Sequence, residues 1–214
     1  MAHGTHRRAG LSIRIAILIE GDTETAFLPK VREFLKGRLV QNRMPKLDPL
    51  PFDGRIPTGP KLKRVVENLL TGRQPADAVI ALSDVYTGTR EFADAQDAKM
   101  KMKQWVGNEP RFHPHVAQHD FEAWLLPFWK DIQDLAGSNR AVPGINPENV
   151  NHNNPPAHRL QEVFRTGSKG RAYVKPRDAS RILRGKDLLV SAIACSELKA
   201  FLNTILIRCG APTL

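Results

Sequence analysis

The sequence predicts an α/β fold: a mainly parallel sheet flanked by helices, followed by a helical C-terminal part. Two observations predict this fold. Over residues 11–136, short β-branched apolar runs alternate with longer segments of helical apolar spacing, as in βαβ units. Over residues 157–214 the apolar spacing is helical throughout. The length of 214 residues suits a single domain.

Three segments are predicted to be strands. Residues 12–19 (SIRIAILI) are nearly all apolar, which is typical of a central strand that is covered on both faces. Residues 78–82 (AVIAL) have the same character. Residues 111–118 are predicted to be a third strand, and Pro114 favours an edge position because proline has no N–H to donate. Residues 41–57, rich in Pro, Asp and Gly, predict a loop with room for one short strand.

Helices are predicted between and after these strands. The first follows Gly21, with Asp22 or Thr23 as its N-cap. Pro127 predicts a kink in a later helix, in which Trp124 is expected to be part of the core rather than a base-stacking platform. The other predicted helices cover residues 59–71, 90–106, 121–135, 157–165, 178–184 and 187–208.

Two further segments complete the predicted organisation. Residues 1–10 are expected to form a flexible basic tail. Residues 137–156 are rich in Pro, Asn and Gly and predict a connecting loop. This loop would separate the α/β core, residues 11–136, from a helical C-terminal part, residues 157–214, that packs on the core.

The chain is strongly basic. Its 32 Lys and Arg residues exceed its 22 Asp and Glu residues, which gives a formal net charge of +10 and a pI near 9.9. This balance favours a polyanionic partner, most simply nucleic acid; the alternative is a soluble protein that happens to be basic. With 41% hydrophobic and 25% charged residues, the composition excludes a disordered chain, a collagen-like repeat and a coiled coil.

Several other classes find little support. No apolar run approaches the ~20 residues that span a bilayer, so a cytoplasmic protein without membrane contact is expected. Cys195 and Cys209 form neither a paired-cysteine metal motif nor a disulfide framework. His113 and His115 share one strand face, but without a third soft ligand ordinary edge histidines are favoured over a zinc site. The phosphate-binding loop of ATPases and the G-x-S-x-G motif are absent from the sequence.

Acidic residues follow each of the three predicted strands. Glu20 closes the first strand, and Glu24 lies one helical turn later. Asp84 closes the second strand, and Asp120 and Glu122 follow the third. In a parallel sheet these ends meet at one edge, where clustered carboxylates repel one another unless a cation joins them. Hard oxygen ligands suit Mg²⁺ or Mn²⁺, and a carboxylate-held metal in a basic protein points to phosphodiester chemistry.

We expect Glu20, Asp84 and Glu122 to hold the cation. Glu24 is expected to be a further ligand or a general base. Each acid also has a structural interpretation: Glu20 as the end of a strand, and Asp84 as a turn or cap residue. Glu24 and Glu122 suit the first turn of a helix, where the helix dipole favours acids. Their occurrence at three successive strand ends favours a site.

A basic stretch lies in the C-terminal part of the chain. Its candidate nucleic-acid contacts are Lys169, Arg171, Lys175 and Arg177, with Arg181 on the helix that follows. Lys175 is also a candidate to stabilise the charge that builds up on a phosphate during cleavage. The alternative is a solvated loop without a ligand.

Four features resemble a known family. They are Glu20-Gly21-x-x-Glu24 after an apolar strand, Ser83-Asp84-Val85-Tyr86-Thr87-Gly88, His119-Asp120-Phe121-Glu122-Ala123-Trp124, and Pro156-x-x-Arg159-Leu160 with Tyr173-x-Lys175. The first resembles the Toprim domain of topoisomerases and primases, in which a strand-end glutamate and a later D-x-D hold divalent metal. Together, in this order and spacing, they resemble a prokaryotic Toprim-like group, domain of unknown function 4276, over most of residues 12–205.

The resemblance implies a Toprim-type α/β fold and a role in prokaryotic defence against phage or foreign DNA. It also implies a partner ATPase of the AAA or ABC type, because similar domains are often encoded beside one. Glu20 matches the Toprim glutamate, and Asp84 matches the first acid of D-x-D. Tyr86 stands where the second acid is usual. Glu122 replaces that ligand, or a single metal is bound, or the chain is catalytically silent.

The sequence therefore predicts a metal-dependent Toprim-like nuclease, the effector subunit of an anti-phage defence system, that cleaves nucleic acid with Mg²⁺ or Mn²⁺. The alternative is a silent module of the same fold that binds nucleic acid or regulates an ATPase. A phosphatase or phosphotransferase is a third reading, which the basic charge disfavours. DNA and RNA substrates both stay open, as does a homo-oligomeric state.

Overall fold

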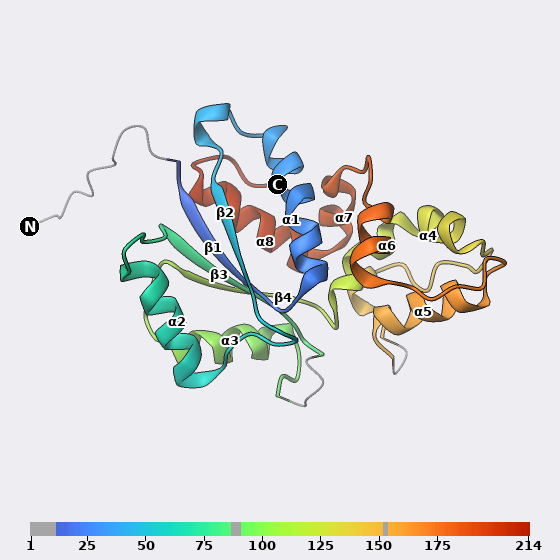
Figure 1. Ribbon diagram of the computed structural model, residues 1–214, viewed down its shortest axis with the longest axis horizontal. Coiled ribbons are helices and arrows are strands. Elements are labelled where there is room, and N and C mark those ends of the chain that lie inside the picture. Colours follow the sequence, from blue (N-terminus) through green and yellow to red (C-terminus); the bar gives the residue numbers. More distant parts are fainter. Residues whose placement is uncertain (1–11, 87–90, 152–153) are drawn as a thin grey trace, which may run out of the picture.

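Figure 1 shows a parallel sheet with helices on both of its faces. The computed structural model describes residues 12–86, 91–151 and 154–214. Within these residues the sheet has four strands in the order β2-β1-β3-β4, with every pair parallel. The strands are β1 (Arg14–Ile19), β2 (Lys46–Pro51), β3 (Ala78–Asp84) and β4 (Phe112–Ala117). The predicted α/β fold is confirmed; the predicted tail at residues 1–10 lies outside the described residues.

Strand β1 lies inside the sheet because both of its faces are apolar. Ile15, Ile17 and Ile19 belong to one hydrophobic cluster, whereas Ala16 and Leu18 belong to another on the opposite face. All five side chains are fully buried. Because successive side chains of a strand point to opposite faces of the sheet, β1 packs against helices on both faces.

The prolines of the outer strands explain the two edges of the sheet. Pro114 lies in β4, which pairs with β3 alone among the described strands, so the predicted edge position is confirmed. Pro49 and Pro51 lie in β2, which forms the other edge. Proline is tolerated there because one side of an edge strand needs no ladder hydrogen bond. Strand β2 occupies the space that the sequence left for a short strand within residues 41–57.

Two helical layers cover the sheet. Apolar residues of α2 and α3 pack on the face that carries Ala16 and Leu18, and those of α1, α7 and α8 pack on the face that carries Ile15. In the described part of the chain, no helix has the length and apolarity needed to cross a membrane. These helices are α1 (Asp22–Lys36), α2 (Gly59–Thr71), α3 (Ala95–Val106), α7 (Leu188–Ala194) and α8 (Ser196–Arg208).

The other helices form a lobe on the right of Figure 1. Its buried residues, among them Leu160, Phe164 and Ile182, belong to the same hydrophobic cluster as Ile15 and Phe27. Lobe and sheet therefore share one continuous core. The lobe contains the 3-10 helix η2 (Phe121–Phe128), α4 (Trp129–Ala136), η3 (Pro147–Asn149), α5 (Pro156–Thr166) and α6 (Lys175–Ile182), and a further 3-10 turn, η1 (Gln41–Arg43), follows α1.

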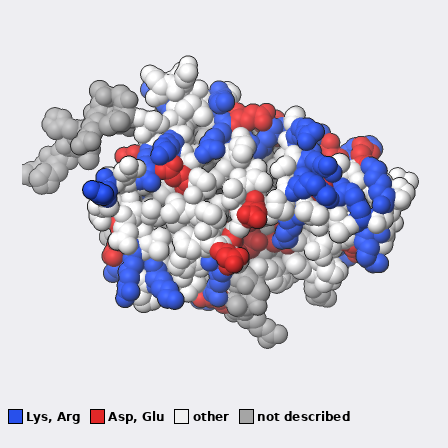
Figure 2. All heavy atoms as spheres, viewed as in Figure 1, with Lys and Arg blue, Asp and Glu red and all other residues white. Residues whose placement is uncertain are grey.

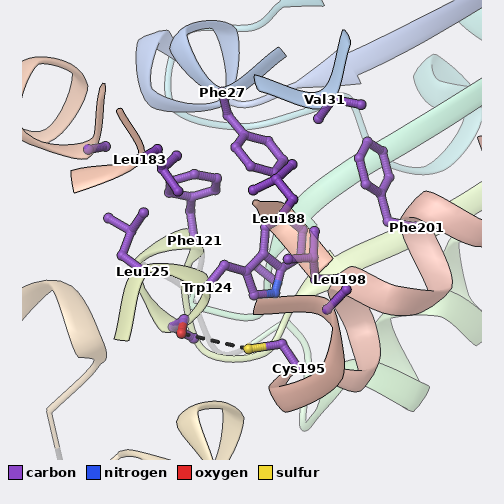
Figure 3. Packing of buried hydrophobic residues seen from close by; sticks show 14 of the residues in the cluster. Phe27, Val31, Phe121, Trp124, Leu125, Leu183, Leu188, Cys195, Leu198 and Phe201 are labelled. Atoms are coloured by element: carbon purple, nitrogen blue, oxygen red, sulfur yellow. Dashed lines mark hydrogen bonds between the residues drawn. The ribbon is translucent and has the colours of Figure 1, made fainter. Parts of the chain in front are cut away.

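Trp124 lies at the centre of this core, as Figure 3 shows. Its ring lies 5.8 Å from Phe27 of α1, 5.6 Å from Phe121 and 6.2 Å from Phe201 of α8, measured between centroids. The thiol of Cys195 lies beneath and points to the carbonyl oxygen of Ala123, at 3.9 Å. Trp124 is only 1% exposed, so the predicted core position is confirmed.

Two helix predictions are wrong in their continuity. Residues 121–135 form a 3-10 helix that gives way to α4 at Trp129, directly after the predicted kink at Pro127. Residues 187–208 form two helices, because Cys195 has extended backbone (φ −124°, ψ 105°) between α7 and α8. The apolar spacing continues through this break, since Cys195 is buried like its neighbours.

Helix starts also differ from the sequence prediction. Neither Asp22 nor Thr23 is the N-cap of α1; Gly21 occupies that position without a side-chain hydrogen bond. Helix α3 begins at Ala95, not near residue 90, because the carboxylate of Asp94 caps the N–H of Asp97 at 2.8 Å. Helix α6 begins at Lys175, three residues before its predicted start.

Candidate metal centre at the strand ends

Five carboxylates follow the strands at one edge of the sheet. Glu20 comes directly after β1, and Glu24 lies in the first turns of α1. Asp84 ends β3. Asp120 and Glu122 stand at the start of η2, after β4. The parallel register brings these strand ends together, as the sequence predicts.

Glu20 is tied to the end of the neighbouring strand. It is 8% exposed, and its Oε1 accepts hydrogen bonds from the Ser83 hydroxyl and from the main-chain N–H of Asp84, the latter at 3.3 Å. The backbone of β3 therefore orients Glu20, and a carboxylate at the end of β1 points at the end of β3. Glu24 is similarly buried, at 7% exposed, and Asp84 is partly exposed.

Glu122 and Asp120 lie deeper. Glu122 is fully buried and accepts hydrogen bonds from the Tyr173 hydroxyl at 3.4 Å and from Lys175 Nζ at 3.3 Å. Asp120 accepts the N–H of Ala157 at 3.0 Å with Oδ2, while its buried Oδ1 has no hydrogen-bond partner. An unpartnered buried oxygen is costly, and it leaves this end of the cluster short of positive charge.

The clustered acids raise one another's pKa. Burial, and then the charge of Glu24, raise the pKa of Glu20 to about 7 against the hydrogen bond from Ser83. Burial and the charge of Glu122 raise the pKa of Asp120 to about 7. Burial and the charges of all four other acids raise the pKa of Asp84 well above its usual value. Burial and mutual repulsion thus favour the protonated form of these carboxyls, and a bound cation would oppose that preference.

Lys175 forms an ion pair with this cluster, and the charge of Arg55 also acts on Glu20. Burial acts to lower the pKa of the lysine, but the charges of Glu122, Asp120 and Asp84 outweigh burial and raise it, so the side chain stays charged. Its ion pair with Glu122 spans 3.3 Å, and 43% of the lysine side chain is exposed. Glu122 therefore holds a charged amine at the mouth of the site.

An open cleft of about 570 Å³ gives access to the acids. Its lining includes Glu20, Glu24, Asp84, Tyr86 and Lys175, together with the backbone after β2. Glu122 does not line the cleft. The structure thus brings together the five predicted catalytic residues, but it places Glu122 behind Lys175 rather than at the open surface.

The donor atoms of this cluster fit a hard divalent cation. Glu20, Glu24 and Asp84 present carboxylate oxygens to the cleft, and such ligands are preferred by Mg²⁺ and Mn²⁺. Among the described residues, the side chains as they stand form no group of three or more His, Cys, Asp or Glu that could hold a metal ion. The raised pKa values and the unpartnered Asp120 oxygen indicate that the positive charges of Lys175 and Arg55 do not offset the negative charge of the cluster.

Three arginines of the predicted basic stretch surround one buried carboxylate. Arg171 lies 2.7 Å, Arg177 3.1 Å and Arg181 3.8 Å from the oxygens of Asp178, which is fully buried. Burial acts to raise the pKa of Asp178, but hydrogen bonds from Arg171 and Arg177 lower it to about 2. Three positive charges facing one negative charge leave an excess of two at the surface. We call these four residues the arginine cluster.

Lys169 points elsewhere: its Nζ donates to the carbonyl oxygen of Asp134 on α4, at 2.6 Å. Figure 2 shows Lys and Arg side chains gathered over the lobe on the right, beside acidic side chains near the middle of the same face. The side chains of the predicted basic stretch thus make three kinds of contact. Lys175 contacts the acids of the cleft, the arginines contact Asp178, and Lys169 contacts α4.

Some functional candidates were missed by sequence reasoning. Asp178 looks like one acid in a basic run, although its position three residues before Arg181 on a helix was a usable signal. Ser83 was noted only as part of the motif around Asp84, and its contact with Glu20 had no signal because it joins residues 63 apart in the sequence. His113 and His115 bond to Arg208 and Thr204 of α8, in keeping with edge histidines.

Asp178→Asn is expected to lower the free energy of unfolding by about 2–4 kcal/mol, because it removes the charge that holds three guanidinium groups. Urea unfolding measures this effect. Glu162→Gln is the matched control, since Glu162 also pairs with two arginines, Arg140 and Arg159, but is 27% exposed, so a much smaller change is expected. An Asp178→Asn protein as stable as wild type would contradict the central place of this carboxylate.

The fold and the site define an α/β protein with an acidic cleft at the carboxyl ends of its parallel strands. Its sequence matches the model of the family described as Domain of unknown function (DUF4276) over residues 19–206, and the chain belongs to that family. No curated protein and no solved structure matches the sequence. The predicted family is thereby confirmed, whereas the wider relationship to Toprim domains stays a prediction.

Proposed function

We propose that this protein is a metal-dependent, Toprim-like nuclease that cleaves phosphodiester bonds of nucleic acid. The observation that carries the proposal is the convergence of Glu20, Glu24 and Asp84 from two neighbouring strand ends on one open cleft, with Lys175 beside them. The protein has a net charge of +10, yet this cleft is lined by acids. A local excess of negative charge suits a site that binds a cation, and the positive charge elsewhere suits a phosphate-bearing substrate.

Glu20, Glu24 and Asp84 would hold Mg²⁺ or Mn²⁺ in this cleft. Once bound, such a cation supplies a nucleophilic water and stabilises the leaving oxygen of a phosphodiester. Ser83 and the main chain of Asp84 fix the orientation of Glu20 through its Oε1. The pKa of Glu24 is raised by burial and by the charge of Glu122, which suits a side chain that accepts a proton.

Lys175 would stabilise the charge that develops on the phosphate. Its amine is held by Glu122 and stays charged, and it lines the same cleft as Glu20 and Asp84. The contacts of Glu122 favour the positioning of Lys175 over the direct metal ligation expected from the sequence. Tyr173 supports Glu122 from the other side with its hydroxyl.

The arginine cluster would bind the nucleic-acid backbone beside the cleft. Its guanidinium groups have fixed positions because they share Asp178, and Arg177 and Arg181 each have 46% of the side chain exposed. Phosphate contacts of this kind position a nucleic acid without reading its sequence. Binding through them weakens as salt concentration rises, since counterions are released on association.

The resemblance to Toprim domains supports a defence role in the cytoplasm, with a partner ATPase supplying the nucleotide-driven step. The sequence itself has no phosphate-binding loop of the ATPase type. A second candidate function is a silent module that binds nucleic acid or regulates the ATPase. Tyr86, in the position where a Toprim domain usually has its second acid, is the observation that favours it.

A cleavage assay separates these candidates. Purified protein is incubated with plasmid, single-stranded DNA and tRNA in Mn²⁺, Mg²⁺ or EDTA, with and without the product of the neighbouring gene. The proposal predicts cleavage of at least one substrate with metal and none in EDTA or with Glu20→Gln. Glu67→Gln on α2, a carboxylate outside the cleft, is the matched control and keeps activity. Absence of cleavage under every condition would favour the silent module.

A further inference from the structure

Tyr86 is an exposed aromatic side chain at the mouth of the acidic cleft. It is 45% exposed, although large aromatic side chains are usually buried, and it lines the same cleft as Asp84, two residues earlier. A tyrosine here contributes no carboxylate oxygen to a cation. The exposed position of Tyr86 at the cleft therefore indicates a function other than metal binding.

The ring of Tyr86 is fixed from three directions. The imidazole of His119 stacks against it, with ring centroids 5.5 Å apart and planes 30° apart. The main-chain N–H of Tyr86 donates to the carbonyl oxygen of His119 at 2.8 Å. Its hydroxyl lies 2.8 Å from Nδ2 and 3.1 Å from Oδ1 of Asn151. Loops after two strands and before α5 thus hold one exposed ring in place.

The backbone of His119 has an uncommon conformation. Its φ of 68° lies in the left-handed region, and no other non-glycine residue of the described chain has a positive φ. This conformation is unfavourable for a residue with a Cβ and persists where surrounding contacts enforce it. In this chain His119 stacks on Tyr86 and directly precedes Asp120, the first acid after β4.

We propose that Tyr86 is a stacking platform for an unpaired nucleobase, so that the protein acts on single-stranded nucleic acid. This inference rests on the proposed function. Aromatic side chains bind single strands by stacking on bases, whereas the bases of a duplex are already stacked on each other. A base on Tyr86 leaves its phosphate beside Asp84 and Lys175, which line the same cleft.

Fluorescence anisotropy with a labelled single-stranded oligonucleotide tests the platform in EDTA, which prevents cleavage, and again in Ca²⁺. Tyr86→Leu keeps an apolar side chain but removes the ring, and it is expected to weaken binding of the single strand by about 5–100-fold. Tyr86→Phe keeps the ring and is expected to retain most of the affinity. Duplex binding, which depends on the arginine cluster, should be equal in all three proteins.

Three results with the variants would overturn the platform. They are wild-type affinity of Tyr86→Leu for the single strand, an equal loss for single strand and duplex, and an equal loss in Tyr86→Phe and Tyr86→Leu. The last result would mean that the hydroxyl contact with Asn151 matters rather than the ring. Wild-type protein that binds no single strand in either buffer also overturns it.

The same variants separate this inference from the proposed nuclease. Cleavage that needs Glu20 but is unchanged in Tyr86→Leu would leave the nuclease standing and remove the platform. If binding of the single strand depends on the ring of Tyr86 but no cleavage occurs in Mn²⁺ or Mg²⁺, the platform stands and the nuclease is wrong. If a duplex containing one mismatched base binds in a ring-dependent way while the single strand does not, the ligand is a base flipped out of a duplex, and the single-strand proposal is wrong.

Discussion

Asp84→Asn is expected to reduce metal-dependent cleavage by more than about 100-fold while leaving the protein folded. The substitution keeps the size of the side chain and removes the charge that four neighbouring acids oppose. It also removes a carboxylate that lines the same cleft as Glu20 and Lys175. Cleavage rates in Mn²⁺ and calorimetric titration with Mn²⁺ measure the two expected losses, of turnover and of metal binding.

The controls for Asp84→Asn separate chemistry from folding. Glu67→Gln, on the exposed part of α2, should cleave and bind Mn²⁺ as wild type does. Thermal unfolding of Asp84→Asn in EDTA should occur at or above the wild-type Tm, because repulsion within the cluster is relieved. An Asp84→Asn protein that cleaves within about tenfold of wild type would contradict this account of the site.

Glu20→Gln is expected to stabilise the metal-free protein more at pH 8 than at pH 5. The pKa of Glu20 is raised from 4.5 to about 7, so the folded protein binds more protons here than the unfolded chain does. The free energy of unfolding therefore falls as pH rises between these values, by on the order of 2–3 kcal/mol. Glutamine carries no such penalty, and it resembles the protonated carboxyl that wild type has at pH 5.

Thermal unfolding of both proteins in EDTA measures this difference. We expect the Tm of Glu20→Gln to exceed that of wild type by about 5–10 °C at pH 8 and by much less at pH 5. His113 and His115, whose pKa values burial lowers to about 4 and about 3, act in the opposite sense in both proteins and so cancel. Mn²⁺ at pH 8 should raise the Tm of wild type only. A difference in Tm that does not depend on pH would contradict the raised pKa.

The strands and their terminal acids could be predicted from the sequence because the signal is local. Ile15 to Ile19 are apolar on both faces, so the position of Glu20 at a strand end followed directly. The prediction of strand β2 was weaker, because Pro49 and Pro51 are typical of loops and are tolerated in a strand at the edge of a sheet. The break at Cys195 had no signal, since a buried residue with extended backbone keeps the apolar pattern.

The contacts within the site depend on tertiary structure and could not be predicted. Lys175 and Glu122 are 53 residues apart, and Tyr86 and Asn151 are 65 apart. The sequence marked Lys175 as a candidate to stabilise phosphate charge, but it could not show that Lys175 contacts Glu122 while Arg177 pairs with Asp178. In the fold, Lys175 at the start of α6 forms an ion pair with Glu122. Arg177 pairs instead with Asp178 of the same helix. Burial of Glu122 behind Lys175 is the main difference from the expected ligand set.

Anomalous X-ray scattering from crystals soaked in Mn²⁺ tests the proposed metal site itself, because it locates the metal without relying on turnover. We expect a peak at the ends of β1 and β3, with oxygens of Glu20 and Asp84 at about 2.0–2.2 Å. The peak should be lost in Glu20→Gln crystals and kept in Glu67→Gln crystals. No peak in this cleft at millimolar Mn²⁺, or a peak only at surface carboxylates elsewhere, would contradict the assignment of a metal centre.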